Sequence, residues 1–184
     1  ATMTTTLFTN AHIATGEPGS TAASTLPLQD ILVTDGVFTA FGPGLAQQYE
    51  AQGGDLAAIE VVDLGGKLVC PPFCDTHLHL DYVFTARKPG AVNESGTLFE
   101  GIQRWSETKS DLTVDEIKQR AKIGIKKEML HGVQLIRSHA DVTDPNLTSL
   151  KALLELKEEL KDTVTLQIVS FPQEGMYSYE GPHG

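Results

Sequence analysis

The residues best suited to chemistry lie close together in the segment Asp75-Thr-His-Leu-His-Leu-Asp81. On a β-strand, residues two apart point to the same face, so His77 and His79 would share one side. Asp75 and Asp81 would fall on that same side. Two imidazoles about 6.6 Å apart at their Cα atoms can reach one metal ion at the roughly 2.0–2.1 Å typical of zinc–nitrogen bonds. The spacing therefore indicates a metal site, although a His-x-His pair on a half-exposed strand also occurs by chance.

An alternation of strands and helices after Gly66 would position this segment. We expect strands over 68–80, 133–142 and 163–171, the first of them interrupted by Pro71-Pro72. A helix is expected from Thr113 to His131, and another opens at Asp144-Pro145, a cap followed by proline. Such alternation is typical of βαβ units with a parallel sheet, where functional sites gather at the carboxyl ends of the strands. The histidine pair lies at that end of the first strand, which favours the metal interpretation.

Both helices are predicted from local signals. Thr113 and Glu116 have the spacing of a capping box. Apolar residues recur at helical spacing in each segment: Ile117, Ala121, Ile125 and Met129 in the first, and Leu147, Leu150, Leu154 and Leu160 in the second. These stripes are expected to face the core.

The first third of the chain reads as short strands separated by turns. Asp35-Gly36 between two apolar runs predicts a hairpin with a type I′ turn. Segments 16–27 and 42–54 are expected to be loops because they are rich in turn-forming residues. We therefore expect a small β-domain over 1–67 and a barrel portion over 68–184.

Three parallel strands with two crossover helices cannot close a barrel, since eight strands with their helices take about 250 residues. The predicted fold class is α/β: the first three βα units of a TIM-type (β/α)8 barrel, preceded by part of a small β-sandwich domain, with the barrel incomplete. An open doubly wound sheet is the alternative. For a nucleotide role it would need a glycine-rich loop after its first strand, and none follows Leu80.

Composition narrows the function classes. The chain has 184 residues, 24 of them acidic and 14 basic, with a formal net charge of −10. Binding to nucleic acid or to an anionic membrane surface needs clustered basic residues, so neither is expected. There is no apolar run of about 20 residues and no secretory signal, so the expected location is the cytoplasm and the expected partner a small-molecule substrate.

The two cysteines are expected to be free. Cys70 and Cys74 lie four residues apart in a segment read as extended, which separates their Cα atoms by about 13 Å. A disulfide needs less than about 7 Å. We expect two buried thiols.

The segment 71–81, preceded by 61–69, resembles the entry to the barrel of the amidohydrolase superfamily, in which a small β-domain precedes a metal-bearing His-x-His strand. Pro71-Pro72 replaces the usual proline-glycine, a departure shared by cytosine deaminase-like members. Further stretches similar to that branch are 95–101, 136–142 and 167–175, the last containing Phe-Pro-Gln-Glu-Gly.

This resemblance implies roles for particular residues. His77 and His79 would bind a single divalent metal, zinc or iron, both of which suit imidazole ligands. Gln173 would form hydrogen bonds with the amide edge of a pyrimidine, because its side chain has both a donor and an acceptor. Leu98 would line the pocket. A supporting role around the site is expected for His139, Asp141 and Asp81, and an equal alternative is that His139 and Asp141 form a structural hydrogen-bonded pair.

The resemblance also implies a reaction. Metal lowers the pKa of its bound water, hydroxide attacks the carbon bearing the exocyclic amine, and ammonia leaves. A carboxylic acid must carry the proton, and the resemblance places it, with further ligands, beyond Gly184. We therefore expect this chain to be inactive without a C-terminal barrel segment or second chain, and to form a homo-oligomer when complete.

The sequence also has to be compared with three functions other than that of a pyrimidine deaminase. A related amidohydrolase could act on s-triazines or other cyclic ureas and amidines, although the Phe-Pro-Gln-Glu-Gly stretch favours the pyrimidine branch. The chain could instead be an inactive fragment that serves only as a binding module. A nucleoside-type zinc deaminase is disfavoured, because its Cys-x-x-Cys and His-x-Glu motifs are absent from these 184 residues.

Overall fold

The computed structural model describes residues 3–14 and 27–176. Contacts divide the chain into two compact units, Ala1–Pro71 and Pro72–Gly184. The loop predicted over 16–27 lies outside the described residues, apart from Pro27. In the described ranges no helix combines the length and the apolar character that crossing a membrane requires.

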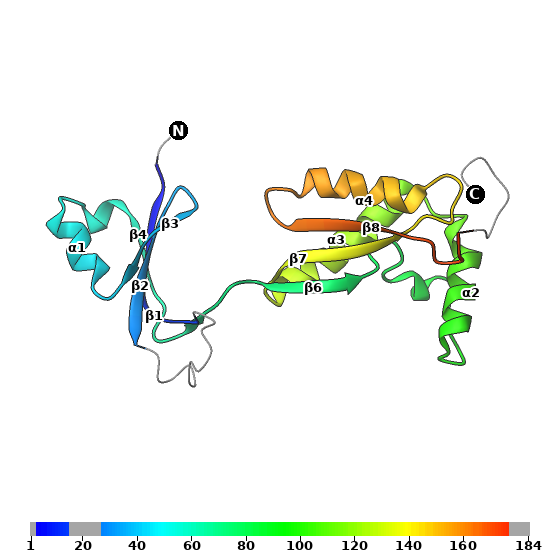
Figure 1. Ribbon diagram of the computed structural model, residues 1–184, viewed down its shortest axis with the longest axis horizontal. Coiled ribbons are helices and arrows are strands. Elements are labelled where there is room, and N and C mark those ends of the chain that lie inside the picture. The colour runs from blue at the N-terminus through cyan, green and yellow to red at the C-terminus, as the bar shows by residue number, and fades with distance from the viewer. Residues whose placement is uncertain (1–2, 15–26, 177–184) are drawn as a thin grey trace. The chain divides into compact units, whose positions relative to one another are not determined.

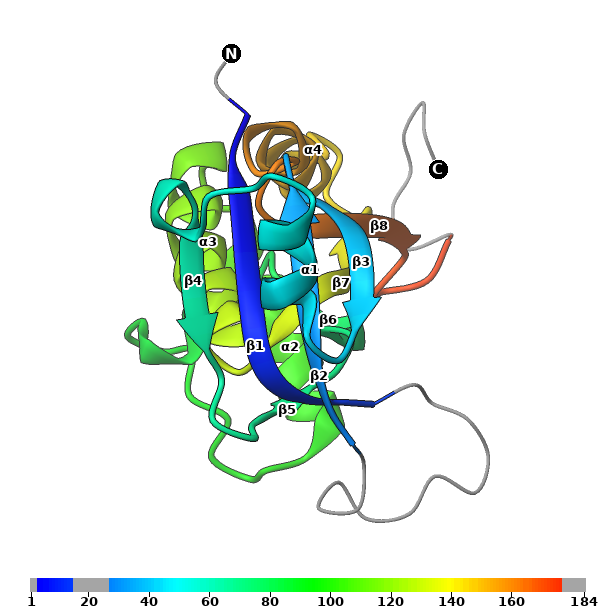
Figure 2. The same ribbon diagram turned by 90° about the vertical axis from the view of Figure 1, so that its left-hand side faces the viewer.

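The first unit is built on a five-stranded sheet with β1 (Thr5–Ile13) inside it. β1 pairs antiparallel with β2 (Leu28–Thr34), which continues into β3 (Val37–Gly42) (Figure 2). On its other side β1 pairs parallel with β4 (Glu60–Asp63) and β5 (Leu68–Val69). The predicted hairpin is confirmed: Asp35 and Gly36 have φ of 50° and 76°, the positive values that a type I′ turn requires.

Part of the segment 42–54 forms a helix, so the prediction of a loop there is wrong. Helix α1 (Leu45–Ala51) packs on β1 and β2, and a short 3-10 turn, η2 (Leu56–Ala58), follows it. The buried carboxylate of Asp30 accepts the backbone N–H of Leu45 at 2.9 Å. This cap comes from a neighbouring strand, and a local reading of the sequence therefore misses it.

The second unit contains a parallel sheet in the order β6 (Phe73–Leu78), β7 (Val133–Asp141), β8 (Thr165–Phe171). Helices α3 (Val114–Leu130) and α4 (Thr148–Glu159) pack together against it (Figure 1). The connection from β6 to α3 also contains η3 (Thr85–Arg87) and α2 (Leu98–Lys109). Three parallel strands with crossover helices are the βα units expected of an incomplete barrel, and the sheet remains open.

The strand predicted over 68–80, with its interruption at Pro71-Pro72, is two separate strands that belong to different sheets. Its first part, β5, pairs with β1, and its second part, β6, begins after Pro71-Pro72. Proline has no backbone N–H to donate, so it interrupts a strand ladder. β6 also ends at Leu78, and Asp81 lies buried in the turn that follows. The prediction that Asp81 shares a strand face with His77 is therefore wrong.

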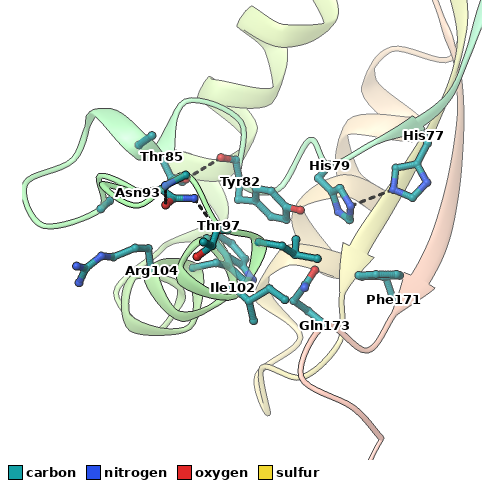
Figure 3. A pocket seen from close by; sticks show the side chains of 16 residues that line it. His77, His79, Tyr82, Thr85, Asn93, Thr97, Ile102, Arg104, Phe171 and Gln173 are labelled. Carbon is teal, nitrogen blue, oxygen red and sulfur yellow. Dashed lines mark hydrogen bonds between the residues drawn. The ribbon is translucent and has the colours of Figure 1, made fainter.

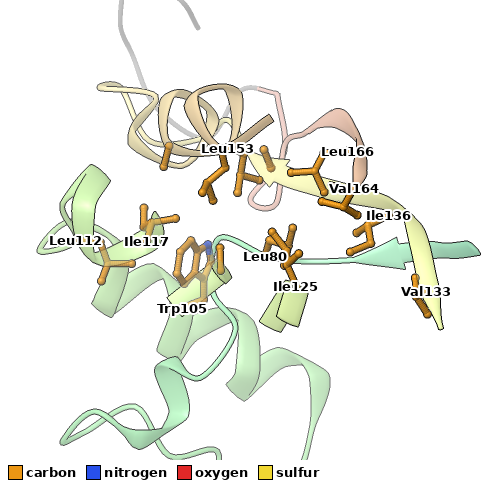
Figure 4. Packing of buried hydrophobic residues seen from close by; sticks show 14 residues of the cluster. Leu80, Trp105, Leu112, Ile117, Ile125, Val133, Ile136, Leu153, Val164 and Leu166 are labelled. Carbon is orange, nitrogen blue, oxygen red and sulfur yellow. The ribbon is translucent and has the colours of Figure 1, made fainter. Parts of the chain in front are cut away.

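A buried apolar cluster fills the space between this sheet and its helices (Figure 4). The capping box of Thr113 and Glu116 is confirmed, and the predicted stripe of α3 points into the cluster. The predicted stripe of α4 is only partly right. Its buried apolar residues are Ala152, Leu153 and Leu156, whereas Leu154 is exposed. The helix begins at Thr148 and not at Pro145, so the predicted start at Asp144-Pro145 is wrong, because Leu147 has a left-handed φ of 53° that a helix cannot contain.

The prediction for the cysteines is also partly right. Cys70 and Cys74 are both free, but both are exposed rather than buried. Cys74 lies on β6, which is an edge strand of the open sheet, and Cys70 lies in the connection that precedes it. Neither position is covered by the helices that bury the core.

The packing of α4 gives a direct test of the core. Leu153 is 0% exposed and Leu154 is 51% exposed on the same helix. We expect Leu153→Ala to lower the free energy of unfolding by about 2–5 kcal/mol, because it removes apolar contacts and leaves a cavity. Leu154→Ala is the matched control and should cost less than about 0.5 kcal/mol. Urea unfolding of the purified variants measures both; equal losses would contradict the observed orientation of α4.

Candidate active site

The two histidines of the His-x-His motif face each other at the carboxyl end of β6. The Nε2 atoms of His77 and His79 are 3.3 Å apart (Figure 3). Asp75 accepts the backbone N–H of His77 on its Oδ1 atom at 2.9 Å. This bond fixes the strand end from which the His77 ring projects, so both imidazoles are aimed at one point.

The arrangement fits two ligands of one metal ion. Two nitrogens at about 2.05 Å from a tetrahedral ion are roughly 3.3–3.4 Å apart, and the observed separation is 3.3 Å. In the described residues no group of three or more His, Cys, Asp or Glu side chains could hold a metal. The described part of the chain therefore offers two imidazoles that could bind a metal ion, one fewer than the three protein ligands usual at a catalytic zinc site.

The protonation of His79 suits a metal ligand. Its Nδ1 atom lies 3.0 Å from the carbonyl oxygen of His139. A carbonyl can only accept, so Nδ1 carries the hydrogen and the Nε2 lone pair of the neutral ring faces His77. Burial lowers the pKa of His79 below its usual value, outweighing the opposing bond to His139. The ring is thus held neutral, in the tautomer that a metal needs.

Aromatic rings surround the pair. His139 stacks on His77 with ring centroids 4.0 Å apart, and Tyr82 stacks on His79 at 4.6 Å. Phe171 meets His79 edge-on at 5.2 Å. Buried Nδ1 of His139 has no hydrogen-bond partner among the described residues. The rings restrict how His77 and His79 can rotate.

A pocket of about 790 Å³ opens beside the histidines. His77 and His79 line it together with Gln173, which follows β8 (Figure 3). Leu98, which begins α2, lines the pocket as well. The structure therefore brings together the four residues for which the sequence predicts metal or substrate contacts. Other lining side chains include Tyr82, Asn93, Thr97, Ile102, Trp105 and Phe171.

Asp141 is a buried carboxylate, only 1% exposed, that contacts the pocket-lining Trp105. Its Oδ2 atom accepts Trp105 Nε1 at 2.7 Å and Lys109 Nζ at 3.2 Å, and its Oδ1 atom accepts the backbone N–H of Thr143 at 2.8 Å. Burial by itself would raise the pKa of Asp141, but the bonds from Thr143 and Trp105 and the charge of Lys109 lower it overall. Asp141 is therefore ionised.

Asp81 makes a hydrogen bond with the backbone of Asp141, whereas the side chain of His139 makes none with the side chain of Asp141 in the described part of the chain. Asp81 accepts the backbone N–H of Asp141 at 2.8 Å and that of Tyr82 at 3.1 Å. Burial raises the pKa of Asp81 to about 6. Among the described contacts, no hydrogen bond joins the side chains of His139 and Asp141: the first faces His77 and the second faces α2. The alternative prediction that His139 and Asp141 form a hydrogen-bonded pair is therefore wrong.

Sequence reasoning assigns no role to Tyr82, Trp105 or Lys109, although all three lie at or under the pocket. Trp105 is the only tryptophan of the 184 residues, and this is the one local signal that could have singled it out. Helix α2, which carries Trp105 and Lys109, is itself absent from the predicted elements. Its contribution depends on contacts with β7, more than 30 residues further along the chain.

Comparison with known proteins places the chain in a family. The model of the amidohydrolase family matches residues 60–184. A crystal structure of 5-methylcytosine deaminase from Klebsiella pneumoniae, liganded with 5-fluorocytosine, is similar with a TM-score of 0.75 and 39% identity. That match covers 94% of this chain and 38% of the other.

Two curated relatives are also similar to this chain. N-isopropylammelide isopropyl amidohydrolase of Pseudomonas sp. (strain ADP) is 35% identical over 120 residues, 63% of this chain and 30% of the relative. Pterin deaminase of Rhizobium rhizogenes is 27% identical over 152 residues, 80% of this chain and 32% of the relative. The chain thus spans about a third of the length of these relatives. Because the family model matches well over half of the sequence and includes the histidine pair, the chain belongs to the amidohydrolase family.

Proposed function

We propose that this chain is part of a metal-dependent hydrolase that removes an amino group from a pyrimidine-type ring, converting cytosine to uracil and ammonia. The observation that carries the proposal is the meeting of the paired Nε2 atoms of His77 and His79 with Gln173 in one pocket. The 39% identity to a 5-methylcytosine deaminase over most of the chain supports it.

His77 and His79 would hold the metal ion. When bound, a divalent ion supplies hydroxide near neutral pH by lowering the pKa of water. The contribution of this chain is to keep the His79 ring neutral and both imidazoles aimed at one point, through the His79 bond to the His139 carbonyl and the stacked rings. Fixed ligand orientation of this kind raises metal affinity.

Gln173 and Leu98 would bind the ring. A side-chain amide offers both a donor and an acceptor, which matches a ring edge that carries a carbonyl beside a nitrogen. Leu98 contributes an apolar wall from the start of α2. The ring would be oriented by Gln173, with its apolar faces against Leu98 and the aromatic side chains.

An s-triazine substrate is the second candidate. It is favoured by the 35% identity to N-isopropylammelide isopropyl amidohydrolase. Ammonia or amine release from cytosine, 5-methylcytosine and N-isopropylammelide, measured side by side with the metal-loaded full-length protein, separates the two. Higher kcat/KM on the triazine than on either pyrimidine would contradict the pyrimidine proposal.

Removal of either proposed ligand should abolish metal binding. We expect His77→Ala and His79→Ala each to lower metal affinity by more than about 100-fold, the upper range for loss of a merely supporting contact. Metal content after dialysis, measured by mass spectrometry, tests this. His131→Ala is the control, because His131 is exposed at the end of α3; a metal content equal to that control would contradict the proposed site.

Substitution of Gln173 should weaken substrate binding without removing the metal. Gln173→Leu loses one or two hydrogen bonds worth about 0.5–1.5 kcal/mol each, so kcat/KM should fall roughly 2- to 160-fold. Steady-state ammonia release and metal content measure the two properties separately. Gln134→Leu, at an exposed position early in β7, is the matched control. Unchanged kcat/KM in Gln173→Leu would refute the role of Gln173.

A further inference from the structure

Lys109 is a largely buried cation that joins three parts of the second unit. Its side chain is 12% exposed. From the last turn of α2 it reaches Asp141 at the end of β7 at 3.2 Å, Thr143 Oγ1 at 2.7 Å, and Glu174 after β8 at 2.5 Å. An ammonium has three hydrogens to donate, and these three acceptors match that number.

The contact with Glu174 bears directly on the pocket. Gln173 lines the pocket and precedes Glu174 in the chain. Hydrogen bonds of this segment also include one from the Gly175 N–H to the Pro172 carbonyl, at 2.9 Å, and one from the Val142 N–H to the Phe171 carbonyl, at 3.1 Å. Glu174 therefore ties the loop that carries Gln173 to α2, which carries Leu98 and Trp105 on the other wall.

We propose that Lys109 is a positioning residue for substrate binding, which acts through Glu174 to hold Gln173 against the pocket. This inference rests on the proposed function for its substrate. Lys109 does not line the pocket, so it acts on substrate only through the segments that its side chain joins. Asp141 anchors the ammonium from below, and Glu174 transmits that position to the loop.

Two variants separate the parts of this contact. Glu174→Gln removes the charge that Lys109 binds and keeps the shape of the side chain. Lys109→Met removes the cation and keeps the apolar stem. Each should raise KM for cytosine about tenfold, because a binding group displaced by 1 Å can cost up to about 100-fold. We expect kcat to stay within about twofold, since uniform substrate binding affects KM alone.

The double variant tests whether the two residues act as one. Because Lys109 acts through Glu174, Lys109→Met/Glu174→Gln should have a KM within about twofold of the worse single variant. Independent effects would instead multiply. Metal content should equal that of the wild type in all three, which distinguishes this effect from loss of the His77 and His79 site.

Lys118 provides a matched control. Its side chain is 14% exposed, and it joins α3 to α4 by ion pairs with Glu155 and Glu159, outside the pocket. Lys118→Met thus breaks a comparable network. It should lower the thermal midpoint as much as Lys109→Met and leave KM unchanged. An equal rise of KM in Lys118→Met would overturn the proposal, because it would reduce the role of Lys109 to general stability.

Hydrogen exchange gives a readout that does not depend on turnover. Peptides covering 172–176 should exchange at least about tenfold faster in Glu174→Gln than in the wild type, because the local opening free energy falls. Faster exchange with a raised KM supports the proposal, and an unchanged KM or unchanged exchange overturns it. A wild type that releases ammonia from none of the substrates would refute the proposed function, while exchange would still decide whether Lys109 orders this segment.

Discussion

The buried carboxylate of Asp141 is the constraint on which the pocket depends. An ionised carboxylate that is 1% exposed is stable only with charged and polar partners around it. Those partners come from separate places: Trp105 and Lys109 from α2, and Thr143 from the connection after β7. Satisfying one buried charge therefore fixes the helix that forms one pocket wall against the strand end that carries His139.

The histidine pair depends on a second set of contacts that is separate from this network. The ring of His79 is oriented by a backbone carbonyl, and the ring of His77 by stacking on His139. Neither contact needs a charge, which agrees with a metal site in which both imidazoles must be neutral. The proposed metal ligands and the proposed substrate-binding wall thus share β7 as a scaffold, and different residues of that strand hold each of them.

Membership of the amidohydrolase family explains why the parallel sheet is open. The chain covers 38% of the 5-methylcytosine deaminase chain to which it is similar. Its three parallel strands present their carboxyl ends, with His77, His139 and Phe171, on one side of the sheet. A barrel of this type builds its site from the ends of several strands, and this chain accounts for three of them.

The sequence by itself determined the features that depend on near neighbours. The Asp35-Gly36 hairpin, the capping box of α3, the alternation of strands and helices and the His-x-His pair all follow from residues within a few positions of one another. Local backbone preferences and side-chain periodicity are strong enough to specify these. The resemblance to the family then indicated Gln173 and Leu98, which spacing alone would not have identified.

Only the tertiary structure decided the features that depend on distant partners. Helix α1 is capped by Asp30 from another strand, and the register of α4 is set by which leucines meet the sheet. Asp81 lies in the turn after β6, where its carboxylate accepts the backbone N–H of Asp141, 60 residues away. Lys109 binds three acceptors on segments that lie more than 30 residues further along the chain. The partners of these buried charged side chains lie on distant segments of the chain, so a local sequence pattern does not identify them.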